Sequence, residues 1–340
     1  MRLPDQHHPG PVTDRELQAI VGNAFGPQPA STAWVRLSGG QINDTRLLTL
    51  ANGHRCVLRV APSEATAIAG PSWFTPYGLR RELAVIEVAS ALRDYLPVTV
   101  AHEFDHSVID RDWVVQQVMP GVSLASIDDS LDSVARSVIW TELGAFTQRL
   151  HALSSDRFGP PAWGPRFTRW SDLVAWDVEG MVEDAGRFGL PVAVFEHLAR
   201  MVDRFAALLD EVTTPSLIHS DLWQPHVFVN RDADGAYRLS GVIDLEFGRF
   251  ADSVSEHLPP TFDLGNVPDP MRSAFMAGYG PFTPRPGDAI RTRIYRAVGL
   301  SWAATLAAYQ GKPHDDVVTD LTQSLDTLDR LTTGTIRNAG

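Results

Sequence analysis

Four residues with acid–base or metal-binding side chains lie close together in the second half of the chain. His219, Asp221 and His226 belong to the stretch IHSDLWQPHVFVN, and Asp244 belongs to GVIDLEF, eighteen residues beyond His226. Between the two stretches, an apolar run, an Asp-Gly turn signal and a second apolar run predict a two-stranded ribbon. Phosphoryl transfer uses this arrangement, because a carboxylate in the loop can orient a hydroxyl while a carboxylate after the ribbon can hold Mg²⁺.

These motifs resemble the aminoglycoside phosphotransferase family, which comprises small-molecule kinases on a protein-kinase-like fold. The resemblance implies that Asp221 orients the acceptor hydroxyl or acts as its base, and that His219 holds the loop by hydrogen bonding. It also implies that His226 and Asp244 bind Mg²⁺, with Glu246 close by. Most members have Asn in place of His226, and an imidazole is a poorer Mg²⁺ ligand than an amide oxygen. His occurs there in branches that resemble working 2''-aminoglycoside and macrolide phosphotransferases, which tend to favour GTP, so we expect an active enzyme that uses ATP or GTP.

A small sheet near the N-terminus must position the nucleotide. Apolar runs and turn signals predict a helix at 13–24 and strands at 34–37, 45–50 and 55–60, the last two joined by an Asn-Gly hairpin turn. The glycine-rich stretch SGGQIN follows the first strand, and backbone N–H groups in such a turn can approach phosphate oxygens. A glycine pair alone indicates only a turn, so the phosphate reading depends on its position before VLRV. The residues assigned to the nucleotide on this basis are Ser38, Gly39, Gly40 and Asn43.

A cation for the nucleotide phosphates must come from an arginine. The only lysine of the chain is Lys312, far from this sheet, whereas kinases use a lysine on the third strand. Arg59 in VLRV is therefore the candidate phosphate clamp. Residues 61–78, rich in Pro, Gly, Ser and Ala, are expected to form a loop. A helix is predicted at 79–95, and Glu82 in its first turn could pair with Arg59. The alternatives are a solvent-facing arginine and an acidic residue favoured by the helix dipole.

Two further motifs lie before the C-terminal half. The stretch HEFDH at 102–106 matches the zinc signature HExxH, which requires a helix to bring both histidines to one face. The β-branched residues around it predict a strand, so we expect no zinc site. Residues 114–119 resemble the hinge of the family, where the backbone of Gln117 to Met119 would contact the nucleotide base.

The C-terminal half is predicted to be mainly helical. Apolar residues at helical spacing predict helices at 131–153, 171–187, 191–212, 291–310 and 317–331. Asp177 belongs to an acidic run, and in the family such inserted helices line the substrate cleft. Asp177 from this run, Glu246 after the ribbon, and Glu256, which stands where many members of the family have Asp, are the candidates for binding a cationic substrate. A charge run of this kind is more often a solvated face, and that alternative stays open.

The expected architecture is an α+β, bilobal, protein-kinase-like fold. Residues 1–119 would form an N-terminal nucleotide-binding lobe, with an antiparallel sheet and one helix. Residues 120–340 would form a larger, mainly helical lobe for catalysis and substrate binding, with a helical insertion at about 155–212. The resemblance implies transfer of a nucleotide γ-phosphate to a hydroxyl of an antibiotic, first an aminoglycoside or aminocyclitol. A macrolide or a metabolite is the alternative acceptor, and an inactive kinase-like binding module is the alternative of another class.

Composition limits the classes of partner that we expect for the chain. Its 340 residues carry a formal net charge of −12 with a pI near 5.3, and we find no basic patch, so nucleic acid is not an expected partner. The N-terminus lacks an apolar signal core, and no run of eighteen apolar residues predicts a membrane span. A single cysteine, Cys56, fits a reducing cytoplasm. An acidic chain can attract a cationic small molecule, and the oligomeric state stays open.

Overall fold

The computed structural model describes residues 11–26, 33–37, 42–257 and 269–337, with side chains described as far as residue 331. The chain divides into two compact units, each made of several separate segments of the sequence. Residues 120–130 and 224–247 group with the first unit, whereas the expected boundary at 119 places them in the second lobe. The assignment of nucleotide binding to one lobe and substrate binding to the other stays a prediction. The first unit comprises residues 1–70, 74–130 and 224–247, and the second comprises residues 71–73, 131–223 and 248–340.

The first unit is built on a five-stranded antiparallel sheet with the order β1-β2-β3-β5-β4. Buried and half-buried residues alternate along β2, as they do in a strand with one face on a core. Helix α1 (Asp14–Phe25) packs on this core, and Thr13 forms a capping box with Glu16 at its start. The predicted helix and strands are confirmed to within one residue. The strands are β1 (Ala33–Arg36), β2 (Asp44–Thr49), β3 (Arg55–Val60), β4 (Thr99–Glu103) and β5 (Trp113–Gln117).

Two helical segments follow the third strand. Helix α2 (Glu64–Ala69) was expected to be loop, and that expectation is wrong. The Ser63 side chain caps α2 by accepting the backbone N–H of Thr66 at 3.2 Å, which satisfies a free donor in the first turn. Helix α3 (Gly78–Val88) and the 3₁₀ helix η1 (Ser90–Tyr95) together occupy the single helix predicted for this region.

The HEFDH motif lies mostly on a strand. His102 and Glu103 end β4, whereas His106 lies beyond it with a φ of 59° and places its Nε2 2.9 Å from an oxygen of Asp112. Glu103 accepts the indole N–H of Trp113 at 3.3 Å, so its carboxylate links strands β4 and β5. No helix presents both histidines on one face, and the strand prediction is confirmed.

A second sheet in the first unit contains the predicted ribbon. Strands β8 (Val227–Arg231) and β9 (Tyr237–Val242) form an antiparallel hairpin that β6 (Val122–Ser123) extends. Gly121 precedes β6 with a φ of 90°, and a Cβ there would lie 2.0 Å from the carbonyl oxygen of Val229, so only glycine fits. Short helices follow or flank the ribbon: η3 (Gln224–His226), η4 (Leu245–Phe247), α4 (Leu124–Ile127) and η2 (Asp128–Ser130).

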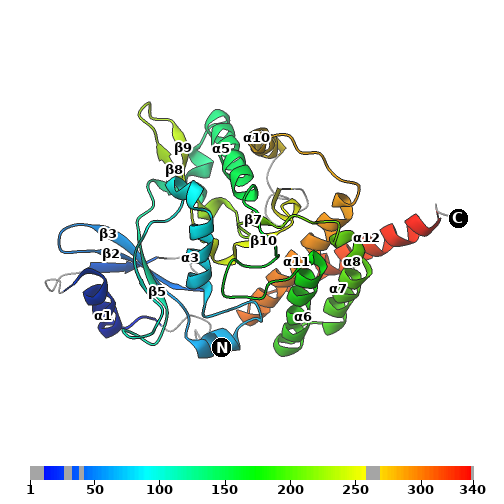
Figure 1. Ribbon diagram of the computed structural model, residues 1–340, viewed down its shortest axis with the longest axis horizontal. Helices are drawn as coiled ribbons and strands as arrows, with labels where there is room; N and C mark the ends of the chain where they lie inside the picture. Colours follow the sequence, from blue (N-terminus) through cyan, green and yellow to red (C-terminus); the bar gives the residue numbers. More distant parts are fainter. Residues whose placement is uncertain (1–10, 27–32, 38–41, 258–268, 338–340) are drawn as a thin grey trace. The chain divides into compact units, whose positions relative to one another are not determined.

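The second unit is mainly helical. Helices α5 and α10 lie side by side, as do α6 and α7, and the long helices α11 and α12 follow each other at the C-terminal end (Figure 1). Among the described residues, no helix has both the length and the apolar character needed to cross a membrane. The helices are α5 (Ser133–His151), α6 (Trp170–Phe188), α7 (Val192–Arg204), α8 (Ala206–Leu209), α9 (Val254–His257), α10 (Asp269–Tyr279), α11 (Asp288–Tyr309) and α12 (Asp315–Arg337).

Close backbone contact joins α5 to α10. A Cβ on Gly144 of α5 would lie 2.0 Å from the carbonyl oxygen of Phe275, and a Cβ on Gly278 of α10 would lie 1.8 Å from that of Thr141. Both glycines therefore permit an approach that a side chain would block. Beside these helices, β7 (Ser216–Ile218) and β10 (Arg249–Ala251) form a short antiparallel pair. The α+β expectation is confirmed, with the large sheet in one unit and most helices in the other.

Candidate functional site

A buried ion pair in the first unit joins the third strand to helix α3. Arg59 lies on β3 opposite Val114 of β5, and its Nη1 donates to Glu82 Oε2. Gln116 Nε2 donates to the other carboxylate oxygen of Glu82 at 3.2 Å. The Glu82 side chain is fully buried, so the pair is held away from solvent. The predicted pairing of Arg59 with Glu82 is confirmed, and the alternative of a solvent-facing arginine is wrong.

The second arm of the same guanidinium contacts the end of the ribbon. Arg59 Nη2 donates to Asp244 Oδ1 at 2.6 Å and lies 3.8 Å from Glu246 Oε2. Asn43 Nδ2 donates to the same oxygen of Glu246 at 2.9 Å. Burial alone lowers the pKa of Arg59, but the carboxylates of Glu82, Asp244 and Glu246 together raise that pKa above its ordinary value. Arg59 is therefore a fixed positive charge that binds strand β3, helix α3 and the ribbon together.

Glu246 is a buried carboxyl of this cluster with a raised pKa. It is 4% exposed, and burial and the neighbouring Asp244 raise its pKa to about 8, although Arg59 and the Asn43 amide act in the opposite direction. A Cβ on Gly78 would lie 2.6 Å from its Oε2, so α3 begins directly against this carboxyl. Glu246 thus lies with the predicted nucleotide residues, and its expected contact with a substrate stays a prediction.

His226 directly precedes β8 and Asp244 follows β9, so both lie at the open end of the ribbon, opposite its turn. His226 Nε2 is 3.3 Å from Asp244 Oδ2, and 28% of the Asp244 side chain is exposed. Asp244 has a φ of 67°, a strained conformation for a residue with a side chain, and such strain is often retained at functional sites. A partly exposed carboxylate is a hard oxygen donor that suits Mg²⁺, and the imidazole nitrogen is the softer member of the pair. The donor set fits a divalent cation at Asp244, and the metal role of both residues stays a prediction.

The other predicted nucleotide residues fall into two groups. Ser38, Gly39 and Gly40 lie outside the described residues. Gln117 ends β5, and its backbone N–H donates to the carbonyl oxygen of Val98 at 2.9 Å, so this donor is engaged within the sheet. The Met119 side chain packs against Gly241 of β9, where a Cβ would lie 2.4 Å from its sulfur. The predicted contacts of Gln117 and Met119 with a base stay predictions.

The loop that carries Asp221 belongs to the second unit and follows β7. Its backbone is held by Glu256 of α9, which accepts the N–H of His219 at 3.0 Å and the N–H of Ser220 at 2.7 Å. His151 Nε2 contacts the same carboxylate at 2.8 Å. The backbone N–H of Asp221 donates to His219 Nδ1 at 3.2 Å, as expected if His219 shapes the loop. Asp221 is half-buried and precedes His226 by five residues in the chain.

Charge and strain are concentrated in this loop. Ser220 has a φ of 69°, so its backbone is in the left-handed region that most side chains avoid. Burial raises the pKa of Glu256, but the hydrogen bonds and charges of His151 and His219 outweigh burial and leave that pKa below its ordinary value. An ionised Glu256 therefore fixes the conformation of the loop immediately before Asp221.

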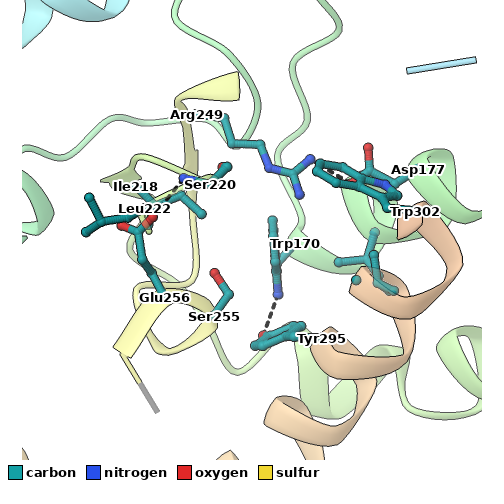
Figure 2. A pocket seen from close by; sticks show the side chains of 13 residues that line it. Trp170, Asp177, Ile218, Ser220, Leu222, Arg249, Ser255, Glu256, Tyr295 and Trp302 are labelled. Carbon is teal, nitrogen blue, oxygen red and sulfur yellow. Dashed lines mark hydrogen bonds and ion pairs between the residues drawn. The ribbon is translucent and has the colours of Figure 1, made fainter. Parts of the chain in front are cut away.

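A pocket of about 90 Å³ lies beside this loop, within the second unit (Figure 2). Asp177 of α6 and Glu256 both line it, but both carboxylates bind protein groups, and their contact with a substrate stays a prediction. Asp177 Oδ2 accepts from Arg249 Nη1 at 2.6 Å. Sequence reasoning missed Arg249 and the aromatic walls of the pocket formed by Trp170 and Trp302. Their local patterns indicate only a strand and two amphipathic helices, so nothing in the sequence revealed that they meet.

The pattern that defines the phosphotransferase enzyme family (APH) matches residues 33–290, which is most of the chain. The chain belongs to the phosphotransferase enzyme family. No curated protein sequence matches the chain significantly.

Solved structures resemble the fold of this phosphotransferase. A thermostable mutant of aminoglycoside phosphotransferase APH(4)-Ia is 17% identical, with a TM-score of 0.62 over 93% of this chain and 99% of that chain. The gentamicin complex of APH(2'')-IIa is 15% identical, with a TM-score of 0.59 over 92% and 96%. A candidate fructosamine-3-kinase from Thermobifida fusca YX-ER1 is 17% identical, with a TM-score of 0.62 over 92% and 99%. These similarities confirm the kinase-like fold.

Proposed function

We propose that this phosphotransferase moves the γ-phosphate of ATP or GTP to a hydroxyl of a small molecule. The observation that carries the proposal is the buried Arg59, held between Glu82 of α3 and Asp244 after the ribbon. In kinases a strand cation paired with a helix glutamate binds nucleotide phosphates, and the ribbon aspartate binds Mg²⁺. Members of the family use this set of groups for phosphoryl transfer, so the matched motif supports the same chemistry here.

Four residues would act in the transfer. Arg59 would bind phosphate oxygens, and Asp244 with His226 would hold Mg²⁺, which supplies positive charge against the phosphates. Asp221 would accept the proton of the acceptor hydroxyl. The hydroxyl oxygen would then form a bond to the γ-phosphorus, while the bond between the γ-phosphorus and the oxygen bridging to the β-phosphate breaks. The products are the phosphorylated alcohol and the nucleoside diphosphate. Catalysis would come mainly from positioning and charge neutralisation.

Two acceptor classes follow from the relatives. Solved neighbours include a ternary complex of APH(4)-Ia with AMP-PNP and hygromycin B, and one of APH(2'')-IIa with streptomycin and ATP. They support an adenine nucleotide as donor and an antibiotic as acceptor, with an aminoglycoside as the first class. The candidate fructosamine-3-kinase supports a metabolite with a sugar hydroxyl as the second class.

The test is transfer itself. The purified chain with Mg²⁺ and either ATP or GTP should add one phosphoryl group to at least one compound of an antibiotic and metabolite panel, detected by mass spectrometry. Asp221→Asn should lose turnover without loss of fold, since the amide cannot accept the proton. Asp234→Asn, in the exposed turn of the ribbon, is the matched control and should behave as the parent chain. Nucleotide binding without transfer to any compound would instead support the binding-module alternative.

The metal role has its own test. Asp244→Asn keeps a hydrogen-bond acceptor for Arg59 but removes the negative charge, so nucleotide affinity should no longer increase when Mg²⁺ is added. Calorimetric titration of ATP with and without Mg²⁺ measures this difference. An unchanged Mg²⁺ dependence in the variant would show that Asp244 does not hold the ion.

A further inference from the structure

The pocket of the second unit is formed around the chain neighbours of Asp221. Ser220 and Leu222 flank that residue, and both line the pocket. Its other walls come from α6, β7, α9, β10 and α11, all in the same unit (Figure 2). Its volume of about 90 Å³ is several times the roughly 10–15 Å³ that a single buried water needs. The pocket is therefore large enough for part of an organic molecule next to the proposed base.

The two carboxylates of the pocket already bind protein groups. Asp177 is paired with Arg249 at 2.6 Å, with side-chain exposures of 6% and 17%. Glu256 accepts three N–H groups, two from the backbone of the loop and one from His151. A sugar with several ammonium groups would need free carboxylates here, because a buried cation without a partner is costly. The pocket instead presents the guanidinium of Arg249 to such a ligand.

Aromatic and aliphatic groups supply the remaining surface of the pocket. Trp170 donates its indole N–H to Tyr295 Oη at 2.7 Å, and that hydroxyl donates to Asp252 at 2.8 Å. The polar ends of both rings are thus used within the protein. The guanidinium of Arg249 lies 5.5 Å from the ring centre of Trp302, so it stacks on that ring. Flat aromatic walls favour a flat or apolar ligand.

Two polar atoms of the lining point to a specific ligand group. Among the described residues, Ser220 Oγ and Arg249 Nε are buried and have no protein hydrogen-bond partner. Buried polar atoms in native structures are nearly always satisfied, and an exception calls for an explanation such as a bound ligand. The guanidinium N–H can only donate, whereas the hydroxyl can donate or accept. A ligand oxygen that accepts from Arg249, together with a hydroxyl near Ser220, would satisfy both atoms.

We propose that this pocket binds the acceptor beside its reacting hydroxyl, and that it selects an alcohol with a flat or apolar body and one accepting oxygen, such as a carbonyl, rather than a polyamino sugar. The inference rests on the proposed transfer to a hydroxyl, and it disfavours the aminoglycoside class named first there. It assigns Arg249 and Ser220 to acceptor binding.

Binding without nucleotide tests the selection independently of transfer. Methyl mandelate and benzoin are neutral aryl alcohols with one carbonyl, and gentamicin and hygromycin B are the polyamino comparison. Each is titrated into the full chain by calorimetry. We expect the aryl alcohols to bind about tenfold tighter or more, since a site that leaves cations unpaired rejects them strongly. Tighter binding of either aminoglycoside, or no saturable binding of the aryl alcohols, would overturn the inference.

Variants then test the assigned residues. Arg249→Lys keeps a cation for Asp177 but removes Nε, and Ser220→Ala removes the hydroxyl. Each should weaken aryl-alcohol binding about tenfold, the usual effect of losing one buried hydrogen bond. Arg238→Lys, on an exposed part of β9, and Ser137→Ala, on an exposed face of α5, are matched controls that should leave binding unchanged. Binding equal to that of the parent chain in both pocket variants would also overturn the inference.

Transfer assays separate this inference from the proposed function. If the aryl alcohols bind with the expected residue dependence and no phosphoryl group is transferred to any acceptor, the selection stands and the proposed function fails. If aminoglycosides are phosphorylated with a larger kcat/KM than the aryl alcohols, the proposed function stands and the selection fails.

Discussion

Replacing Glu256 with Gln removes the charge that holds the loop before Asp221. The carboxylate accepts three N–H groups at 2.7–3.0 Å and is buried. A hydrogen bond to a charged group contributes roughly 1 kcal/mol more than a neutral one, so three such bonds predict a loss of about 3 kcal/mol in the free energy of unfolding. The amide NH₂ must also face one of the three donors, which leaves that donor unsatisfied. Urea unfolding at neutral pH measures the loss.

The same change should reduce turnover. A loop that shifts by about 1 Å can cost on the order of 100-fold in rate if Asp221 is the base that we propose, because that base must meet the acceptor hydroxyl. We expect Glu256→Gln to lower kcat while nucleotide KM changes little, since the residues proposed to bind the nucleotide belong to the other unit. Glu256→Asp keeps the charge and should recover part of both losses. Glu179→Gln, on an exposed position of α6, is the matched control.

The pH dependence gives the sign of the charge effect. The folded pKa of Glu256 lies below its ordinary value of 4.5, so its stabilisation is present above that value and is lost as pH falls through the folded pKa. The stability difference between the parent chain and Glu256→Gln should therefore shrink as the pH is lowered from 7 to below about 4. If Glu256→Gln unfolds and turns over like Glu179→Gln at pH 7, the reasoning about this carboxylate is refuted.

Two further substitutions test the packing and the ion pair. Gly278→Ala should destabilise the chain by about 3 kcal/mol or more, because its Cβ would lie 1.8 Å from the carbonyl oxygen of Thr141. Gly22→Ala, in α1 with no atom within 4 Å of the added Cβ, should stabilise the chain by up to about 1 kcal/mol, and equal unfolding midpoints for the two variants would contradict this account. Arg59→Lys cannot bind two carboxylates with separate arms, so the KM for ATP should rise about tenfold. An unchanged KM in a steady-state assay would remove Arg59 from nucleotide binding.

Local sequence patterns were sufficient for the parts of the fold that depend on neighbours in the chain. The strands and α1 followed from apolar runs and turn signals such as Asn-Gly, and the ribbon followed from its Asp-Gly turn. The pairing of Arg59 with Glu82 was predicted only because the resemblance to kinases supplied a contact across 23 residues. Helix α2 was missed because a six-residue helix among prolines and glycines carries little periodicity.

The pocket shows why the rest could not be predicted. Asp177 was expected to meet a cationic substrate, yet its partner Arg249 lies 72 residues further along the chain. An acidic run on a helix does not reveal whether a distant arginine will neutralise it. Glu256 was likewise chosen as a substrate residue from its position after the ribbon, whereas its three hydrogen bonds come from two other segments. Tertiary pairing, which no local pattern encodes, decides the charge that a pocket offers.

The order in which the first unit is assembled has a consequence during synthesis of the protein. Its sheet is complete by residue 117, but Arg59 finds Asp244 only 185 residues later, and Asn43 finds Glu246 203 residues later. A ribosome that adds about 5–20 residues per second leaves Arg59 without this partner for roughly ten seconds or more. Until the ribbon leaves the ribosome, the nascent N-terminal sheet therefore holds the Arg59 charge with only part of its compensating carboxylates. A fragment that stops at residue 119 should for the same reason accumulate as an incompletely folded species rather than as an independent nucleotide-binding domain.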